Sequence, residues 1–250
     1  MKQKAFWPEG LGRLVLETSG STNALALSGG VAAPGWILAG TQTAGRGRRA
    51  RAWDSPRGNF HGTLLLEPQE PADVVALRSF VAALALRDAF VALTGLPDSF
   101  TLKWPNDVLL NGAKVAGILL ESSGMGGRVQ RLAIGIGVNL IAAPDQSVLE
   151  PGALPAVSLL AETGLRVTPE AFLEALAGAY ARREAQFLAG GFAPLRADWL
   201  AHAARLGEVI RARTGQASHE GRFETIDAAG NLILVTAAGR MEIPAADVFF

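Results

Sequence analysis

Apolar and polar positions follow two different patterns along this chain, and the change comes near Leu206. Before it, short apolar runs alternate with longer amphipathic stretches, which predicts strands and helices of an α+β unit over residues 1–204. After it, short runs of alternating apolar residues are separated by turns that contain glycine, which predicts a small β unit over residues 205–250.

The elements expected in the first unit follow from apolar spacing and from helix start and stop residues. Serine or threonine before an apolar run caps a helix, proline fits its first turn, and glycine ends it. The expected helices run from a cap at Ser21 or Thr22 to Gly29-Gly30, over about Ala72–Thr94, from Thr168-Pro169 to about Leu188 before Gly190-Gly191, and over roughly Pro194–Ala204. The expected strands are Arg13–Glu17, Trp36–Gln42, Gly62–Glu67 and three or four more within residues 100–140.

The second unit is expected to hold four short strands. They lie at Gly207–Arg213, His219–Asp227, Asn231–Thr236 and Arg240–Ile243. A unit of this size is near the lower limit at which a single core is stable by itself. We therefore expect it to pack against the larger unit.

Composition narrows the class of protein. Apolar residues make up 49% of the 250 residues and charged residues 18%, which is typical of a globular protein. The formal net charge is zero, so the excess of cations that bulk binding to nucleic acid requires is absent. With no cysteine in the chain, disulfides, thiol nucleophiles and cysteine-based zinc sites are excluded.

No segment of the sequence predicts secretion or membrane insertion. Met1–Gly10 lacks the apolar core of a signal peptide. The most apolar stretch, Phe80–Leu93, is interrupted by Arg87 and Asp88 and is too short to span a bilayer. We expect a cytoplasmic protein that binds neither membrane nor nucleic acid.

A loop rich in arginine and glycine is the first candidate for chemistry. Residues 45–53 read GRGRRARAW, and five arginines fall within twelve residues, at Arg46, Arg48, Arg49, Arg51 and Arg57. Glycine lets the backbone approach a ligand closely, and guanidinium groups match phosphate or carboxylate oxygens in pairs. The loop suits a phosphorylated nucleotide or an acyl-phosphate. The alternatives are a solvated basic loop or a nucleic-acid patch.

A second candidate contains two of the four lysines. The segment from Lys103 to Asp107 reads KWPND, and Asn111-Gly112 is a two-residue hairpin signal that precedes Lys114. The pattern predicts Lys103 and Lys114 on neighbouring strands, with Asp107 near a strand end. A lysine amine can hold a phosphate, and a carboxylate can orient or deprotonate a nucleophile. An ordinary exposed hairpin is the alternative.

Together these motifs resemble the biotin–protein ligases. Five of that family's motifs appear in the family order over residues 13–140, about half of the chain. They are Ser21-Thr22-Asn23, Gln42, the loop 45–53, KWPND with Lys114–Ile118, and the glycine-rich Ile134–Asn139. Only about twenty residues precede Ser21, so the form without a helix-turn-helix domain is expected.

The resemblance implies an α+β fold in which a mixed-sheet catalytic domain is followed by a small SH3-like β-barrel. It implies that ATP, with Mg²⁺, activates biotin as biotinyl-AMP, which then acylates a lysine of a carboxylase's biotin carrier domain. Lys114, Asp107 and Arg48 are the expected catalytic residues, and no metal ligand is assigned. The expected substrate contacts are Ser21, Thr22, Asn23, Gln42, Gly45, Arg46, Gly47, Arg48, Arg51, Trp53, Lys103, Asn106, Lys114, Gly117 and Asn139.

The sequence departs from the family pattern at two places. Ala50 stands where glycine is usual, and a methyl group makes a positive φ costly there. The chain ends DVFF where some relatives have a basic residue, which puts a nucleotide contact from the small unit in doubt. We also expect the arginine loop to be mobile without ligand, because its arginines are unpaired and repel each other.

Three questions stay open at the level of sequence. A lipoate or octanoate ligase or transferase of the same fold, and a non-catalytic effector-binding module, are the alternative functions. Monomer and homodimer are both compatible with the chain. For Ser21-Thr22-Asn23, the alternative to a substrate contact is a helix cap. His61, His202 and His219 lack partners at catalytic or metal-binding spacing and are interpreted as structural.

Overall fold

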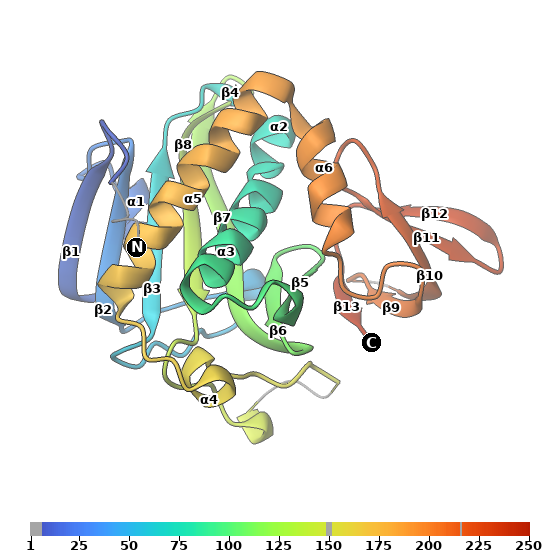
Figure 1. Cartoon of the computed structure of the whole chain (residues 1–250). Helices are drawn as coiled ribbons and strands as arrows, with labels where there is room; N and C mark the ends of the chain where they lie inside the picture. The colour runs from blue at the N-terminus through green and yellow to red at the C-terminus, as the bar shows by residue number, and fades with distance from the viewer. Residues whose placement is uncertain (1–6, 149–151, 216) are drawn as a thin grey trace.

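A computed structural model of the chain describes residues 7–148, 152–215 and 217–250, and it contains two β-sheets and a layer of helices (Figure 1). The larger sheet has eight strands in the order β1-β2-β3-β8-β7-β6-β5, with β4 paired to β8. β1 and β2 are parallel and the other pairs are antiparallel, so the predicted mixed sheet is confirmed. The strands are β1 Gly12–Ser19, β2 Gly35–Gln42, β3 Phe60–Leu66, β4 Glu70–Pro71, β5 Phe100–Lys103, β6 Asp107–Leu110, β7 Ala113–Met125 and β8 Arg128–Val138.

Helices cover both faces of this sheet, because its central strands are apolar on both sides. Trp36 and Ile37 are neighbours in β2, yet they belong to different apolar clusters, since successive side chains point to opposite faces. The long helices α3 (Arg78–Thr94) and α5 (Pro169–Gly190) pack together on one face (Figure 1). The short helix α1 (Thr22–Leu27) packs on the other face.

Several predicted helix ends are confirmed, and two predictions are wrong in detail. Thr168 caps α5 and Gly191 ends it, as expected. The single helix expected over Ala72–Thr94 is two helices, α2 (Ala72–Ala76) and α3. At the junction Leu77 N–H donates to Val74 O, a tighter i→i−3 bond that interrupts the α-helical series. The next helix, α6 (Phe192–Ala201), begins and ends earlier than expected, and the short α4 spans Leu159–Thr163.

The hairpin predicted at Asn111-Gly112 is present between β6 and β7. Both residues have positive φ, 51° and 84°, as a type I′ turn requires. Lys103 and Lys114, however, are not on neighbouring strands. Lys103 ends β5 and Lys114 begins β7, and β6, which starts at Asp107, lies between them.

The C-terminal sheet has five antiparallel strands in the order β12-β11-β10-β9-β13. Their bounds are β9 Val209–Arg213, β10 Ser218–Ile226, β11 Leu232–Thr236, β12 Gly239–Ile243 and β13 Asp247–Phe249. The sequence missed β13 because it is three residues long and follows a proline-containing turn. Closure into an SH3-like barrel stays a prediction, as does the boundary between residues 204 and 205.

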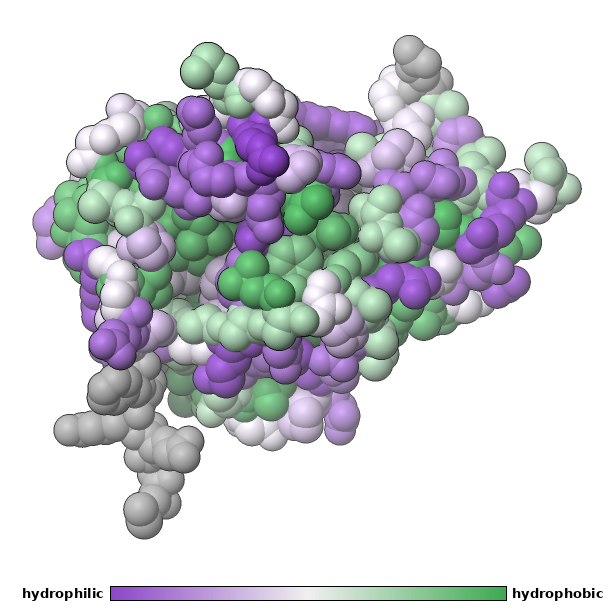
Figure 2. Space-filling model, turned by 90° about the horizontal axis from the view of Figure 1, so that it is seen from above, coloured by the Kyte–Doolittle hydropathy of each residue, from purple (hydrophilic) through white to green (hydrophobic). Residues whose placement is uncertain are grey.

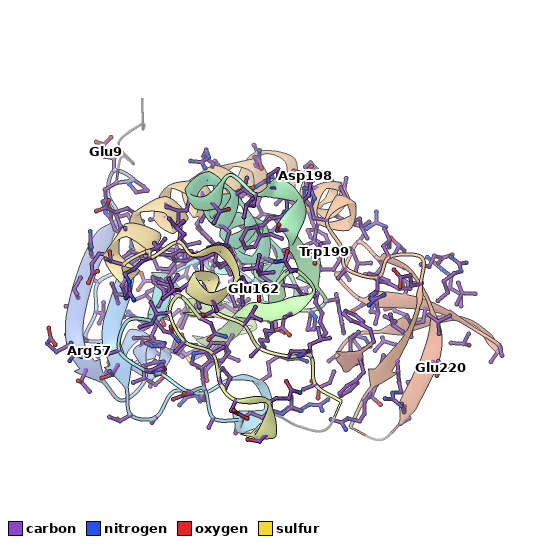
Figure 3. The ribbon with its side chains drawn as sticks, turned by 60° about the horizontal axis from the view of Figure 1, so that its bottom comes forward. Glu9, Arg57, Glu162, Asp198, Trp199 and Glu220 are labelled. Carbon is purple, nitrogen blue, oxygen red and sulfur yellow. The ribbon has the colours of Figure 1, made fainter. Side chains whose placement is uncertain are left out.

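The small sheet packs on the larger unit, as its size predicts. Within the larger unit, Trp199 of α6 (labelled in Figure 3) is buried against Phe80 of α3, with the ring centroids 5.5 Å apart. Trp104, 3% exposed, donates from Nε1 to Gly230 O at 2.9 Å. Residues of both sheets belong to one apolar cluster, so the interface is continuous with the core.

On the face that Figure 2 shows, hydrophobic residues extend over the left and the centre, and hydrophilic residues gather above, below and to the right of them. Within the part of the chain that the structure describes, every helix is too short or too polar to cross a membrane.

Candidate functional site

One cavity of about 1100 Å³ is lined by all of the residues that the sequence predicts as catalytic residues or substrate contacts. The N-terminus of α1, the arginine loop, the β6–β7 hairpin and the end of β8 enclose it, and β13 of the small sheet completes the wall. The nominated residues in its lining are Ser21, Thr22, Asn23, Gln42, Gly45, Arg46, Gly47, Arg48, Arg51, Trp53, Lys103, Asn106, Asp107, Lys114, Gly117 and Asn139.

At one end of the cavity the polar side chains bond to each other. Thr22 N–H and Oγ1 donate to Gln42 Oε1 at 2.9 and 3.1 Å, and Gln42 Nε2 donates to Ser55 Oγ at 3.2 Å. The buried Thr63 hydroxyl lies 2.8 Å from Thr22 Oγ1 and 2.7 Å from Asn23 Oδ1, so it can donate its single proton to either. The network holds these groups in place at the cavity wall.

Ser21 caps a helix and also lines the cavity, and its contact with substrate stays a prediction. Its side chain accepts from Ala24 N–H at 3.4 Å and so caps α1, and it also lines the cavity. The helix cap thus places the residues that follow it, Thr22 and Asn23, at the cavity wall.

Glycine is required at two positions of β8, where side chains from α1 and from the arginine loop cross the strand. A Cβ on Gly135 would lie 2.4 Å from Asn23 Oδ1, and one on Gly137 would lie 2.3 Å from the Trp53 ring. A Cβ added to Gly45 would lie 2.7 Å from Trp53 O. Side chains, rather than a neighbouring strand, make this close approach along β8.

The arginine loop is not unpaired, so that part of the sequence expectation is wrong. Arg46 Nη2 lies 3.0 Å from Glu121 Oε1 on β7. Arg49 Nη1 and Arg51 Nη2 each lie 2.7 Å from Asp247 Oδ2 on β13. The sequence missed these partners because they are far away along the chain. Mobility of the loop without ligand stays a prediction.

Arg57, the last arginine of the group, takes no part in the cavity wall that the structure describes. It projects from the periphery and pairs with the exposed Glu17 at 2.8 Å (Figure 3). Ala50 has φ 57° and its neighbour Arg49 has φ 55°. The positive φ that the Ala50 departure raised is therefore present in the turn.

At the opposite end of the cavity, Asp107 forms a charged group with two lysines. Lys114 Nζ lies 2.7 Å from Asp107 Oδ1, and Lys103 Nζ lies 3.7 Å from Oδ2. Burial raises the pKa of Asp107, but Lys114 and Lys103 lower it by more, so its pKa lies below the ordinary value. Burial also lowers the pKa of Lys103, against the attraction of Asp107. Trp53 lies against Lys114, whose Nζ is 5.6 Å from the ring centroid.

Burial lowers the pKa of the Arg48 guanidinium as well, against the opposing attraction of Asp247 and Asp107. Arg48 remains a cation at neutral pH, because arginine's ordinary pKa is far above it. Its Nη1 donates to Ala246 O at 3.1 Å. The cavity thus holds a group of cations at one end and hydrogen-bonding side chains at the other, an arrangement that fits a phosphorylated ligand with a polar head.

Sequence reasoning missed two kinds of residue. Glu121 lies outside every motif, yet it accepts from both Asn23 and Arg46. Asp247 and Phe249 bring the small sheet into the cavity wall, where the sequence had left its role in doubt. A group of three or more potential metal ligands among His, Cys, Asp and Glu is not present in the described residues.

Comparison with known proteins gives consistent results over both units. The profile of the biotin/lipoate A/B protein ligase family matches residues 13–139, and that of the biotin protein ligase C-terminal domain matches 206–250. A biotin–[acetyl-CoA-carboxylase] ligase of Paracoccus denitrificans is 58% identical over 94% of this chain and 99% of its own. The bifunctional ligase/repressor BirA of Bacillus subtilis is 32% identical, over 85% of this chain and 65% of its own.

Among solved structures, a biotin protein ligase of Aquifex aeolicus in complex with biotin and ATP superimposes with a TM-score of 0.80. It is 26% identical, and the match covers 95% of this chain and 97% of that one.

Proposed function

The chain belongs to the biotin/lipoate A/B protein ligase family and, within it, to the biotin protein ligases; from that premise we propose that it uses ATP to join biotin to a carrier protein. It activates biotin as biotinyl-AMP and transfers the biotinyl group to a lysine of a carboxylase's biotin carrier domain. The observation that carries the proposal is one cavity with a cationic end, at Lys103, Lys114, Arg48 and Arg51, and a polar end at Thr22 and Gln42.

In the first step a biotin carboxylate oxygen attacks the α-phosphorus of ATP. A phosphorus–oxygen bond forms, the bond to the β-phosphate oxygen breaks, and diphosphate leaves. Negative charge builds on the phosphate, so cations already in place lower the barrier. We assign the stabilisation of this charge to Lys114, Arg48 and Arg51. Lys114 must exchange its bond to Asp107 for one to phosphate, which its 32% exposed side chain permits.

In the second step the acceptor lysine amine attacks the carbonyl of the anhydride. A carbon–nitrogen bond forms, the carbon–oxygen bond to AMP breaks, and the proton that the amine loses passes to the Asp107 carboxylate. We assign Asp107 to this amine. Its lowered pKa keeps it ionised at neutral pH, so it orients the amine by charge. When Lys114 turns to phosphate, Asp107 loses its nearest cation and becomes a stronger base.

The remaining assignments are also proposals. Biotin lies at the end of the cavity that Ser21, Thr22, Asn23 and Gln42 line, and magnesium enters bound to ATP as part of that substrate. We place the protein in the cytoplasm, where ATP and carboxylases are present, as a monomer or homodimer that binds neither nucleic acid nor membrane.

The direct test uses purified protein, ATP and magnesium with either biotin or lipoate. We expect biotinyl-AMP with biotin and transfer to a biotin carrier domain when one is added. Lipoyl-AMP formed in preference to biotinyl-AMP would show a lipoate ligase instead. Binding of biotin without any acyl-AMP would show an effector-binding module.

A further inference from the structure

The carboxylate of Asp247 accepts hydrogen bonds from more than one arginine of the loop. Its Oδ2 accepts from Arg49 Nη1 and Arg51 Nη2, each at 2.7 Å. Arg48 Nη1 lies 3.9 Å from Oδ1 and donates to the carbonyl of the preceding residue, Ala246, at 3.1 Å. Three arginine side chains from one turn between β2 and β3 therefore contact two consecutive residues, Ala246 and Asp247, at the start of β13.

The turn that carries these arginines needs support from outside. Arg49 and Ala50 both adopt left-handed φ values, a region that residues other than glycine occupy at a cost. The like charges of adjacent arginines repel each other. Within the turn, the backbone bonds that close it are Gly47 N–H to Arg51 O at 2.8 Å and Arg51 N–H to Arg48 O at 3.2 Å.

Asp247, in contrast, is fixed on a strand. It lies in register with Arg213 of β9, and the residues on either side, Ala246 and Val248, are 0% and 5% exposed. Its own side chain is 12% exposed. Burial raises the pKa of Asp247, but Arg51, Arg49 and Arg48 lower it by more, so the carboxylate is ionised at neutral pH.

We propose that Asp247 is a positioning residue for the nucleotide: it anchors the turn of residues 48–51 to the C-terminal sheet, so that Arg48 and Arg51 face the cavity before ATP binds. The nature of the ligand rests on the proposed function, whereas the anchor does not. Charge-assisted bonds to a rigid strand reduce the ordering that the loop must undergo on binding. The small sheet thereby contributes to ATP binding through an acidic residue.

Asp247 also borders the cavity, so a second role has to be distinguished. A carboxylate that occupied the position of a phosphate would compete with ATP. The two roles predict opposite changes in the Michaelis constant for ATP when the charge is removed.

Asp247→Asn removes the charge and keeps the shape. We expect the KM for ATP to rise roughly tenfold, the scale of one charge-assisted contact that is partly exposed, with a smaller change in kcat and in the KM for biotin. Hydrogen exchange of residues 46–52 should be faster than in wild type without ligand. That difference should vanish when biotin and ATP are both bound. Glu224→Gln is the control, because it breaks a 2.6 Å pair with Arg240 in the same sheet outside the cavity lining.

Arg49→Gln is the second variant, because Arg49 is exposed and is not among the described lining residues. It should raise loop exchange less than Asp247→Asn does, and the double variant should be no worse than Asp247→Asn alone. A lower KM for ATP in Asp247→Asn, or unchanged loop exchange, overturns the proposal, even if the melting temperature falls. A wild-type protein that forms no biotinyl-AMP defeats the proposed function, and loop exchange still tests the anchor.

Discussion

Lys114 and Arg48 both bring a positive charge to the cavity, but their ligand-free partners differ. Lys114 pairs with the carboxylate of Asp107 at 2.7 Å, whereas Arg48 bonds to the backbone carbonyl of Ala246. A lysine can leave a carboxylate for a phosphate and retain a charged partner. An arginine held by the opposite sheet can close the loop over a bound ligand. Removal of Lys114 and removal of Arg48 should therefore impair different steps of the reaction.

Lys114→Ala should slow biotinyl-AMP formation by roughly 10²–10³, because it removes one charge that stabilises the transition state. Single-turnover measurement with biotin and ATP checks this. Arg240→Ala, which removes an exposed cation from the small sheet, should leave the rate unchanged. Adenylate formation at the wild-type rate in Lys114→Ala would place this residue outside the reacting centre.

Arg48→Gly should separate formation of the intermediate from its retention. Activation should continue at a reduced rate, because Lys114 and Arg51 still stabilise charge on the phosphate. The anhydride should escape faster, because a lost charge-assisted contact acts mainly on the off-rate. Escaped biotinyl-AMP acylates any accessible lysine. Labelling of an unrelated lysine-rich protein should therefore rise relative to the carrier domain. Bystander labelling no greater than wild type, with activation intact, would show that another group retains the intermediate.

At the scale of elements, both ends of the arginine loop are tied to the polar end of the cavity. Arg46 bonds to Glu121 of β7, and Glu121 Oε2 accepts from Asn23 of α1 at 2.9 Å. From Asn23 the hydrogen bonds continue through Thr63 and the Thr22–Gln42 pair to Ser55, which donates to Trp53 O at 3.2 Å. Helix, strand and loop thus share one network.

Glu121→Gln should raise the KM for biotin roughly threefold to tenfold, since it weakens a charge-assisted pair on which Asn23 also depends. It should also speed hydrogen exchange at Arg46 without ligand. Glu67→Gln is the matched control, because Glu67 pairs with Arg131 at 3.0 Å beside the same sheet but outside the cavity lining. Equal biotin KM values for the two variants would show that Glu121 does not couple the loop to the biotin end.

At the scale of the whole molecule, the contact between the two sheets is part of the core. Gly230 accepts the Trp104 bond and has φ 84°, and a Cβ added to it would lie 2.7 Å from the Phe80 ring. Gly239 also has a positive φ, 114°, but an added Cβ there meets no atom within 4 Å. A substitution at either glycine would therefore strain the backbone, but only at Gly230 would the added Cβ also clash with a neighbour.

Gly230→Ala should lower the free energy of unfolding by about 1–3 kcal/mol more than Gly239→Ala does, because overpacking adds to the shared backbone cost. Urea unfolding followed by far-ultraviolet circular dichroism and by tryptophan fluorescence measures both values. Equal losses in the two variants would show that the interface tolerates the added methyl group.

Local features were predictable from the sequence. The turn at Asn111-Gly112 follows from two residues that accept positive φ, and α5 follows from the Thr168-Pro169 cap. The predicted site residues came from motifs in the family order, and the folded chain brings them together around one cavity. The mixed sheet was implied by the resemblance to the ligase family. The break at Leu77 and the three-residue β13 were not predictable, because packing partners and pairing decide them.

The sequence by itself determined most of the elements and which side chains could meet a phosphorylated ligand, since turns, caps and amphipathic faces depend on near neighbours. Only the tertiary structure decided what those side chains contact. Arg46 and Glu121 are 75 residues apart, and Arg51 and Asp247 are 196 apart. Charges so far apart in the chain pair only when strand order brings them together, and residue types alone do not encode that order.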